Sequence, residues 1–172
     1  MRAYFFVNSA LSGIQKGIQV AHCVAEMANM ASAVASWTHD KAARDADPEE
    51  VDLHDAYFDW SRHNKTIIVL EGGFNGDLVE IVDFLAQQNI FPCASFTEDE
   101  ETMNRMMTCV GIILPERIYE VAKWTREKTA TLRKDSPEEE WRLFGERSSE
   151  WNPYTDWEVE LIKLINSCPL AR

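Results

Sequence analysis

Hydrophobic and polar residues near the N-terminus follow first the pattern of a strand and then that of a helix. Residues 3–8 are almost all apolar, which is typical of a buried strand. Over residues 14–30, small and apolar residues recur every three or four positions, as they do on one face of a helix. The members of that face are Ile14, Ile18, Ala21, Ala25 and Ala28. We expect this face to pack on a sheet.

A second stripe, of polar residues, follows the same predicted helix beside the apolar one. It consists of Gln15, Gln19, His22, Glu26 and Asn29. Such a line suits a binding cleft, and it also suits an ordinary boundary between core and solvent; the pattern leaves both interpretations open. His22 and Glu26 are one helical turn apart, so we expect them to pair, either for proton transfer or to satisfy a half-buried histidine. We take Gln15, Gln19 and Glu26 as candidate substrate-binding residues.

The rest of the chain alternates between strand and helix patterns. Strands are predicted at 66–70, 91–96 and 108–114, an acidic loop at 97–102, and helices at 48–61, 77–88, 116–134 and 156–167, with a further helix start at 136–139. The strand at 66–70 is apolar on both sides, which indicates a sheet covered on both faces. The sequence therefore predicts an α/β fold: a three-layer α/β/α sandwich on a four-stranded mixed sheet, with extra C-terminal helices.

Length and composition indicate one globular domain. The chain has 172 residues, of which 45% are hydrophobic, and this is enough for a proper core. We expect a single domain over 1–172, with a core at 1–118, an acidic insert at about 38–63 and a helical extension at 119–172. No apolar run reaches the length of a membrane span, and no signal-peptide pattern opens the chain. The four cysteines are scattered, which is typical of reduced thiols, so we expect a cytoplasmic protein.

The formal net charge of -12 disfavours general binding of nucleic acid, because affinity for phosphate rests on Lys and Arg. One stretch, 117–134, is basic nevertheless, and Lys123, Arg126 and Arg133 share one side of its predicted helix. These three side chains are candidates for contact with a tRNA backbone. The alternative is a solvated helix face, since glutamates alternate with the basic residues.

Metal and nucleotide motifs are absent from the sequence. Asp55, Asp59 and His63 share helical spacing, with His39 and His54 nearby, but no H-E-x-x-H or comparable signature is present. The Gly-rich stretch 72–76 has neither the Rossmann spacing nor the P-loop lysine, so we expect a turn there. We predict no metal site and no cofactor.

Taken together, these segments resemble type II peptidyl-tRNA hydrolase, a family of archaea and eukaryotes with phage-encoded relatives. The family helix G-K-x-A-A-Q-x-x-H-A is similar to residues 17–26, and its Lys-led strand is similar to 65–70. Its D-A-G-x-T and Q-T-x-L-x-I-G-P blocks are similar to 98–102 and 108–115. The resemblance covers about residues 3–118. It implies an α/β/α fold and metal-independent hydrolysis of the ester that joins a peptide to tRNA.

The residues on which that family relies are matched only in part. The family threonine falls on Thr108, and the family aspartate falls on Glu98, a longer carboxylate. The family lysine falls on Ile18, which carries no charge; Lys16, two residues earlier, is the candidate replacement. The motif glutamine falls on His22. The resemblance thus implies catalytic roles for Thr108, Glu98, Lys16 and His22, which would supply donor, orienter, cation and base around an attacking water.

Two functions remain open at this point. The first is an esterase acting on peptidyl-tRNA or a related nucleotide ester, which is the default of the resembled family. The second is a catalytically silent relative that binds a protein partner or a small-molecule ligand, which the replaced lysine and the acidic charge favour. A homodimer is also left open.

Overall fold

The structure is a computed structural model of the chain, and it describes residues 1–39, 48–88, 90–122 and 154–172. The chain divides into two compact units. The first comprises Met1–Pro115 together with Cys168–Arg172, and the second comprises Glu116–Ser167. The predicted helix start at 136–139 lies outside the described residues. None of the helices in the described part is long and apolar enough to cross a membrane.

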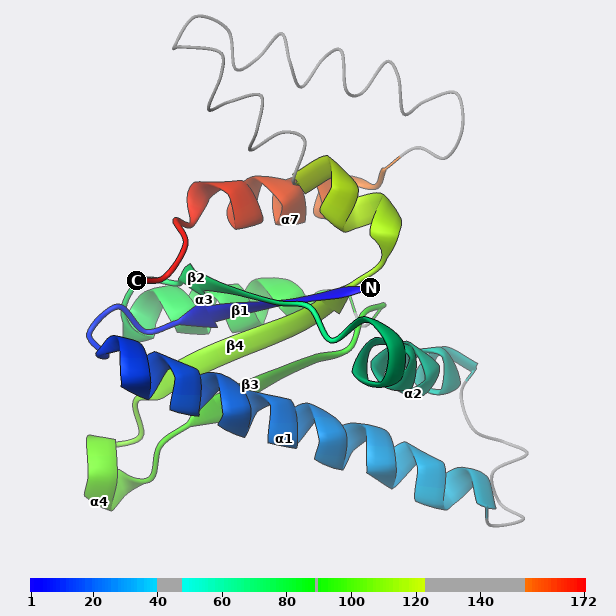
Figure 1. Ribbon diagram of the computed structural model, residues 1–172, viewed down its shortest axis with the longest axis horizontal. Coiled ribbons are helices and arrows are strands. Elements are labelled where there is room, and N and C mark those ends of the chain that lie inside the picture. Colours follow the sequence, from blue (N-terminus) through cyan, green and yellow to red (C-terminus); the bar gives the residue numbers. More distant parts are fainter. Residues whose placement is uncertain (40–47, 89, 123–153) are drawn as a thin grey trace, which may run out of the picture. The chain divides into compact units, whose positions relative to one another are not determined.

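The first unit is built on a four-stranded mixed sheet in the order β2-β1-β4-β3. The strands are β1 (Arg2–Val7), β2 (Ile67–Glu71), β3 (Cys93–Thr97) and β4 (Met107–Leu114) (Figure 1). β1 pairs in parallel with β2, whereas β4 is antiparallel to both of its neighbours. β3 therefore forms one edge of the sheet.

The opposite edge, at β2, is joined by the last residues of the first unit. Leu70 bridges to Leu170, the Glu71 amide donates to the Pro169 carbonyl, and the Ala171 amide donates to the Val69 carbonyl. This segment satisfies backbone groups of β2 that a free sheet edge would leave to solvent.

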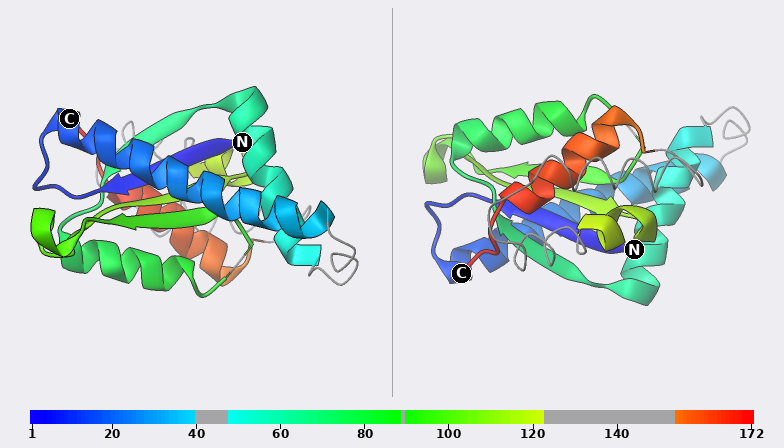
Figure 2. Two further views of the ribbon diagram at one scale, coloured as in Figure 1. Left: turned by 90° about the horizontal axis from the view of Figure 1, so that it is seen from below. Right: turned by 90° about the horizontal axis from the view of Figure 1, so that it is seen from above.

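Helices cover both faces of the sheet, which confirms the predicted α/β fold. α1 (Gly13–His39) crosses the strands diagonally on one face (Figure 2), where α2 (Pro48–Asp59) and the π-helical turn η2 (Trp60–Asn64) also pack. Buried side chains fill this layer: Ala3, Phe5, Val7, Val20, Cys23, Met27, Ala31, Tyr57, Trp60, Cys109 and Ile113. α3 (Asn75–Leu85) lies on the other face, where its Leu78 reaches Phe6.

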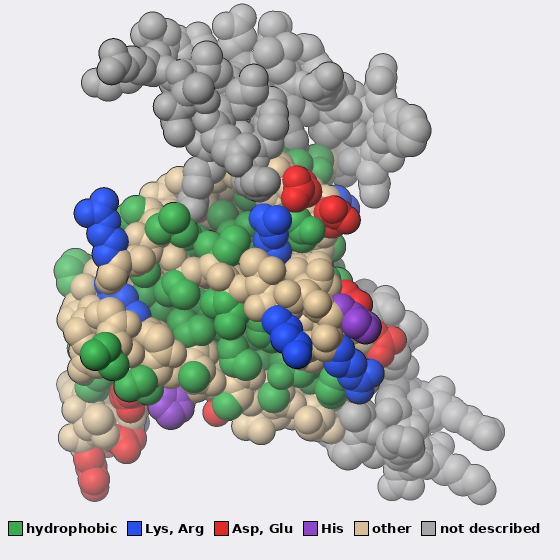
Figure 3. All heavy atoms as spheres, in the orientation of Figure 1, with side chains coloured by type: hydrophobic (Ala, Val, Ile, Leu, Met, Phe, Trp, Pro, Cys, Tyr) green, Lys and Arg blue, Asp and Glu red, His purple; other side chains and the backbone are tan. Residues whose placement is uncertain are grey.

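The predicted packing face of α1 is wrong: the buried face begins two positions later, which at 3.6 residues per turn is about 200° around the helix, nearly the opposite side. Ile14 is 82% exposed and Ile18 is 50% exposed, Ala21 and Ala25 are also exposed, and only Ala28 is half-buried. Figure 3 shows hydrophobic side chains on the surface along this helix. The buried face consists instead of Lys16, Val20, Cys23, Met27 and Ala31. The valine and methionine of this face bury more apolar area than a row of alanines, and Lys16 forms an ion pair with Glu71. The helix is therefore more stable with this face packed on the sheet.

Two short segments also differ from the predictions. The predicted acidic loop at 97–102 contains a single helical turn, α4 (Glu100–Met103). Asp99 caps this turn, because its Oδ1 accepts a hydrogen bond from the Thr102 amide at 2.7 Å. The predicted helix at 48–61 continues as η2 and ends at Lys65, which has a left-handed φ of 51°.

In the second unit, residues 116–122 are helical and α7 spans Asp156–Ser167, as predicted. Thr155 and Glu158 form a reciprocal capping box: the Glu158 amide donates to Thr155 Oγ1, and the Thr155 amide donates to Glu158 Oε2. Glu158 is buried and pairs with Arg117, whose carbonyl accepts a hydrogen bond from the Tyr154 hydroxyl. These contacts tie the two described helical segments of this unit together.

At Gly111 of β4, the side chain of Met27 from α1 packs closely on the sheet. A Cβ at this position would lie 2.5 Å from Phe5 Cε1 and 2.7 Å from Met27 Cε. We expect Gly111→Ala to lower the free energy of unfolding by about 1–3 kcal/mol, because the added methyl overpacks the core. Urea denaturation followed by circular dichroism measures the change.

Gly17→Ala is the matched control for that substitution. Gly17 lies within α1 with nothing within 4 Å of its Cβ position, so we expect alanine there to stabilise the protein by about 0.5–1 kcal/mol. Equal effects of the two alanines would contradict the close packing of α1 on β4.

Candidate functional site

Three of the candidate residues form one hydrogen-bonded chain. Thr108 Oγ1 donates to Gln19 Oε1 at 2.8 Å, and Gln19 Nε2 donates to Glu98 Oε1 at 2.7 Å. Thr108 and Gln19 are buried, whereas Glu98 is half-buried. The carboxylate therefore has a fixed position and remains open to solvent on one side.

Asn8 fixes the strand that carries Thr108. The Asn8 amide donates to the Thr108 carbonyl at 3.0 Å, and its side-chain Nδ2 donates to the Met107 carbonyl at 3.1 Å. Asn8 Oδ1 accepts from the Ala10 amide at 3.0 Å, which holds the turn into α1. Sequence reasoning treated Asn8 only as the end of a strand; the signal that marks it is a polar residue directly after a fully buried run.

His22 lies next to this chain but does not pair with Glu26. Its ring is exposed and stacks on Phe96 of β3, with centroids 4.6 Å apart and an interplanar angle of 12°. The structure contains no hydrogen bond between His22 and Glu26, so the predicted pairing is wrong. The flat face of Phe96 holds the imidazole in place, and the carboxylate of Glu26 is left to line a groove.

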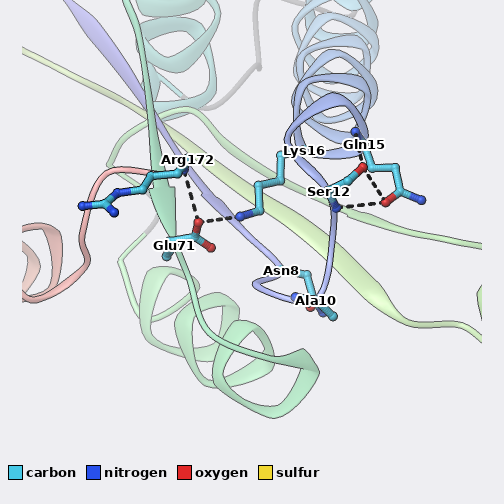
Figure 4. Close-up of polar contacts among 7 residues, drawn as sticks. All are labelled: Asn8, Ala10, Ser12, Gln15, Lys16, Glu71 and Arg172. Atoms are coloured by element: carbon cyan, nitrogen blue, oxygen red, sulfur yellow. Dashed lines mark hydrogen bonds and ion pairs between the residues drawn. The ribbon is translucent and has the colours of Figure 1, made fainter.

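Lys16 points to β2 instead of toward Thr108. Its Nζ lies 2.5 Å from Glu71 Oε1, and Lys16 as a whole is 7% exposed. Figure 4 shows the two side chains directed toward one another from α1 and β2. Glu71 lies beside Val7, and Val7 lies beside Cys109, so the ion pair is two strands away from β4, roughly 10 Å.

Glu71 is held in its charged form. Burial raises the pKa of Glu71. Hydrogen bonds from Lys16, from the Ser9 side chain and from the Arg172 amide lower it, as does the positive charge of Lys16. Together these interactions outweigh burial and bring the pKa below 4.5. The Arg172 amide lies 3.4 Å from Glu71 Oε1. Lys16 is thus fully engaged in a local ion pair.

The remaining candidates have other roles or lie outside the described residues. Gln15 caps α1, because its Oε1 accepts from both the amide and the hydroxyl of Ser12 at 2.9 Å (Figure 4). This is a capping box, S-x-x-Q. The basic residues Lys123, Arg126 and Arg133 lie outside the described part of the chain.

A groove of about 280 Å³ continues the site along β3. Glu26 and Met30 of α1 form one side, and Val82 of α3 and Ala86, which directly follows this helix, form the other. Cys93, Ala94 and Ser95 of β3 and Val110 of β4 also line it. Sequence reasoning missed this groove because its sides come from helices on opposite faces of the sheet.

Within the described residues, no group of three or more His, Cys, Asp or Glu is arranged to hold a metal ion. His63 Nδ1 lies 3.0 Å from Asp59 Oδ1, and both side chains are exposed. The side chains of His39 and His54 are outside the description.

The cysteines of the core are poorly suited to act as nucleophiles. All four cysteines are free thiols. Cys23 Sγ donates to the Ala94 carbonyl at 3.2 Å. A hydrogen bond with Cys23, followed by burial, raises the pKa of Cys109 far above its usual range, and burial raises the pKa of Cys93. Because the thiolate is the reactive form, these residues serve packing.

A scan against models of known protein families matches none, and a search of curated proteins finds no relative.

The Lys16–Glu71 pair makes stability depend on pH. Because folding lowers the pKa of Glu71, its stabilising contribution is complete above pH 4.5 and is lost as the pH falls below that value. We expect Glu71→Gln to reduce the free energy of unfolding at pH 7 by about 1–2 kcal/mol, since one charged hydrogen-bond partner is removed. The difference between wild type and variant should shrink below pH 4.5, which urea denaturation across the pH range will measure.

Glu100→Gln is the control, because Glu100 forms an ion pair with Arg105 in which both side chains are exposed. We expect this variant to stay within about 0.5 kcal/mol of wild type. Equal losses in the two variants, or a difference for Glu71→Gln that does not change with pH, would contradict the assigned role of the buried pair.

Proposed function

We propose that the protein is a metal-independent esterase similar to type II peptidyl-tRNA hydrolase, acting on peptidyl-tRNA or a related nucleotide ester. One observation carries the proposal. Glu98 and Thr108, the two residues that the resemblance matches to the family's acid and threonine, are joined through a single side chain, Gln19. Gln19 is 79 residues from Glu98 and 89 residues from Thr108 in the sequence, so the link that it makes between them does not follow from local structure.

In the proposed mechanism, Glu98 orients and deprotonates a water molecule. One of its oxygens accepts from Gln19, which leaves the other oxygen for the water. The water attacks the ester carbonyl, its proton passes to Glu98, and the proton then goes to the leaving hydroxyl as the tetrahedral intermediate collapses. His22, exposed and held flat on Phe96, is placed to donate a ring N–H to the developing oxyanion.

Thr108 acts as a positioning residue in this proposal. Its hydroxyl is fully buried and donates to Gln19, so it fixes which end of the Gln19 amide faces Glu98. Without that hydrogen bond the amide can rotate and present its oxygen to the carboxylate, which would repel it.

A second function, ligand binding without catalysis, is favoured by the ion pair that Lys16 forms with Glu71. The replacement cation is neutralised by Glu71 and directed to another strand, so it does not contact the Glu98 carboxylate. A relative that kept the fold and lost the cation would still offer the groove beside His22 to a ligand.

Hydrolysis of N-acetyl-aminoacyl-tRNA, a model peptidyl-tRNA, distinguishes these functions. We expect wild type to release free tRNA faster than the uncatalysed reaction, and Glu98→Gln to abolish this release. Thr108→Val should lower kcat by about tenfold to a hundredfold with little change in KM, because it disturbs orientation and leaves substrate contacts in place.

Thr108→Ser, which keeps the hydroxyl, is the matched control and should retain most of the activity. Circular dichroism checks that each variant is folded. Release at the uncatalysed rate by folded wild type would overturn the esterase proposal and leave the binding function. Full activity in Glu98→Gln would refute the assigned mechanism.

A further inference from the structure

The open edge of β3 presents backbone groups that nothing in the described chain satisfies. The Ile113 amide donates to the Pro92 carbonyl, which places Ala94 among the residues that bond to β4. Bonding alternates along an antiparallel strand, so Cys93 and Ser95 direct their N–H and C=O groups away from β4. No described residue hydrogen-bonds to those groups. The other sheet edge, at β2, is joined by residues 169–171, so among the described residues only the edge at β3 stays open.

Residues of this edge line the groove together with two different sets of side chains. On the side of α1, Glu26 and the 57% exposed Met30 rise beside it. On the side of α3, Val82 and Ala86 form an apolar wall. A strand lying along β3 would place alternate side chains against these two walls, because its side chains point to opposite faces.

Charge selects the kind of strand that fits. Glu26 lines the groove, Glu98 follows the end of β3, and Asp83 adjoins Val82 on the surface of α3. None of the lining side chains is Lys or Arg. A second copy of this chain, with a net charge of -12, would bring the same acids to the contact. A peptide with basic side chains is complementary instead.

We propose that the open edge of β3 binds an extended peptide by strand addition, with basic side chains toward Glu26 and apolar side chains toward Val82 and Ala86. The backbone groups of Cys93 and Ser95 supply the hydrogen bonds, and the two walls supply selectivity. This inference is independent of the proposed esterase function, because its test measures binding alone.

The probe is a fluorescein-labelled heptapeptide of alternating valine and lysine, titrated with the full chain and followed by fluorescence anisotropy at low and high salt. We expect saturable binding that weakens with salt. The alternating valine–glutamate peptide should bind at least tenfold more weakly. In an added strand, every second peptide amide faces β3 and the others face away from it. N-methylation of the amides that face β3 should abolish binding, and N-methylation of the others should not.

Substitutions in the protein test the same contact. Ser95→Pro removes the outward amide without removing a hydrogen bond to β4, so we expect about tenfold weaker binding, whereas Ser95→Ala should bind as wild type does. Glu26→Gln should weaken the valine–lysine peptide about twofold to fivefold and leave a valine–glutamine peptide unchanged. Circular dichroism confirms the fold of each variant.

Three results would overturn the inference. The first is no binding of the valine–lysine peptide at millimolar concentration. The second is equal binding of the two methylated peptides, which would indicate a general acidic surface. The third is a wild-type dimer in sedimentation velocity that Ser95→Pro converts to monomer, which would assign the edge to a second copy of the chain.

Discussion

The rotation of α1 on the sheet is the constraint on which the rest of the first unit depends. Two contacts set it. Near the N-terminus of the helix, Lys16 reaches Glu71 of β2. Farther along, Met27 occupies the space that a side chain at position 111 would fill. With the helix fixed at these two points, it has one orientation about its axis, and the other side chains on it are placed by helical geometry.

That orientation has consequences on both sides of the helix. It turns Gln19 inward, where the side chain joins Thr108 to Glu98, and it places His22, Glu26 and Met30 along the edge strand β3. It also leaves Ile14 and Ile18 exposed to solvent, at a cost in apolar burial. The larger side chains on the buried face and the satisfied Lys16 offset that cost.

The sequence predicted the elements and the fold class but not the rotation of α1. Strand and helix periodicities are local properties, so the four strands and α7 were found close to their observed bounds. Two stripes on nearly opposite sides of α1 are both compatible with burial, and the choice between them depends on Glu71, a residue distant in the sequence. The hydrogen-bonded chain was anticipated in part: Glu98 and Thr108 followed from the resemblance, but Gln19 was proposed as a substrate-binding residue, and its role as the link requires the fold. The groove depends on two helices on opposite faces of the sheet, which no local pattern encodes.

The same rotation gives the site its electrostatic character. Lys16 is directed to Glu71, which neutralises its charge. Glu98 and Glu26 therefore have no Lys or Arg among their described contacts on the open side of α1. A carboxylate in that setting favours positive or neutral groups nearby and disfavours phosphate. For an ester of tRNA, productive binding would therefore require cations from elsewhere to hold the backbone, while the peptide end of the molecule approaches the acids. A basic peptide on β3 needs no such compensation. The position of one lysine thus makes the open surface beside β3 more favourable to positive groups than to phosphate.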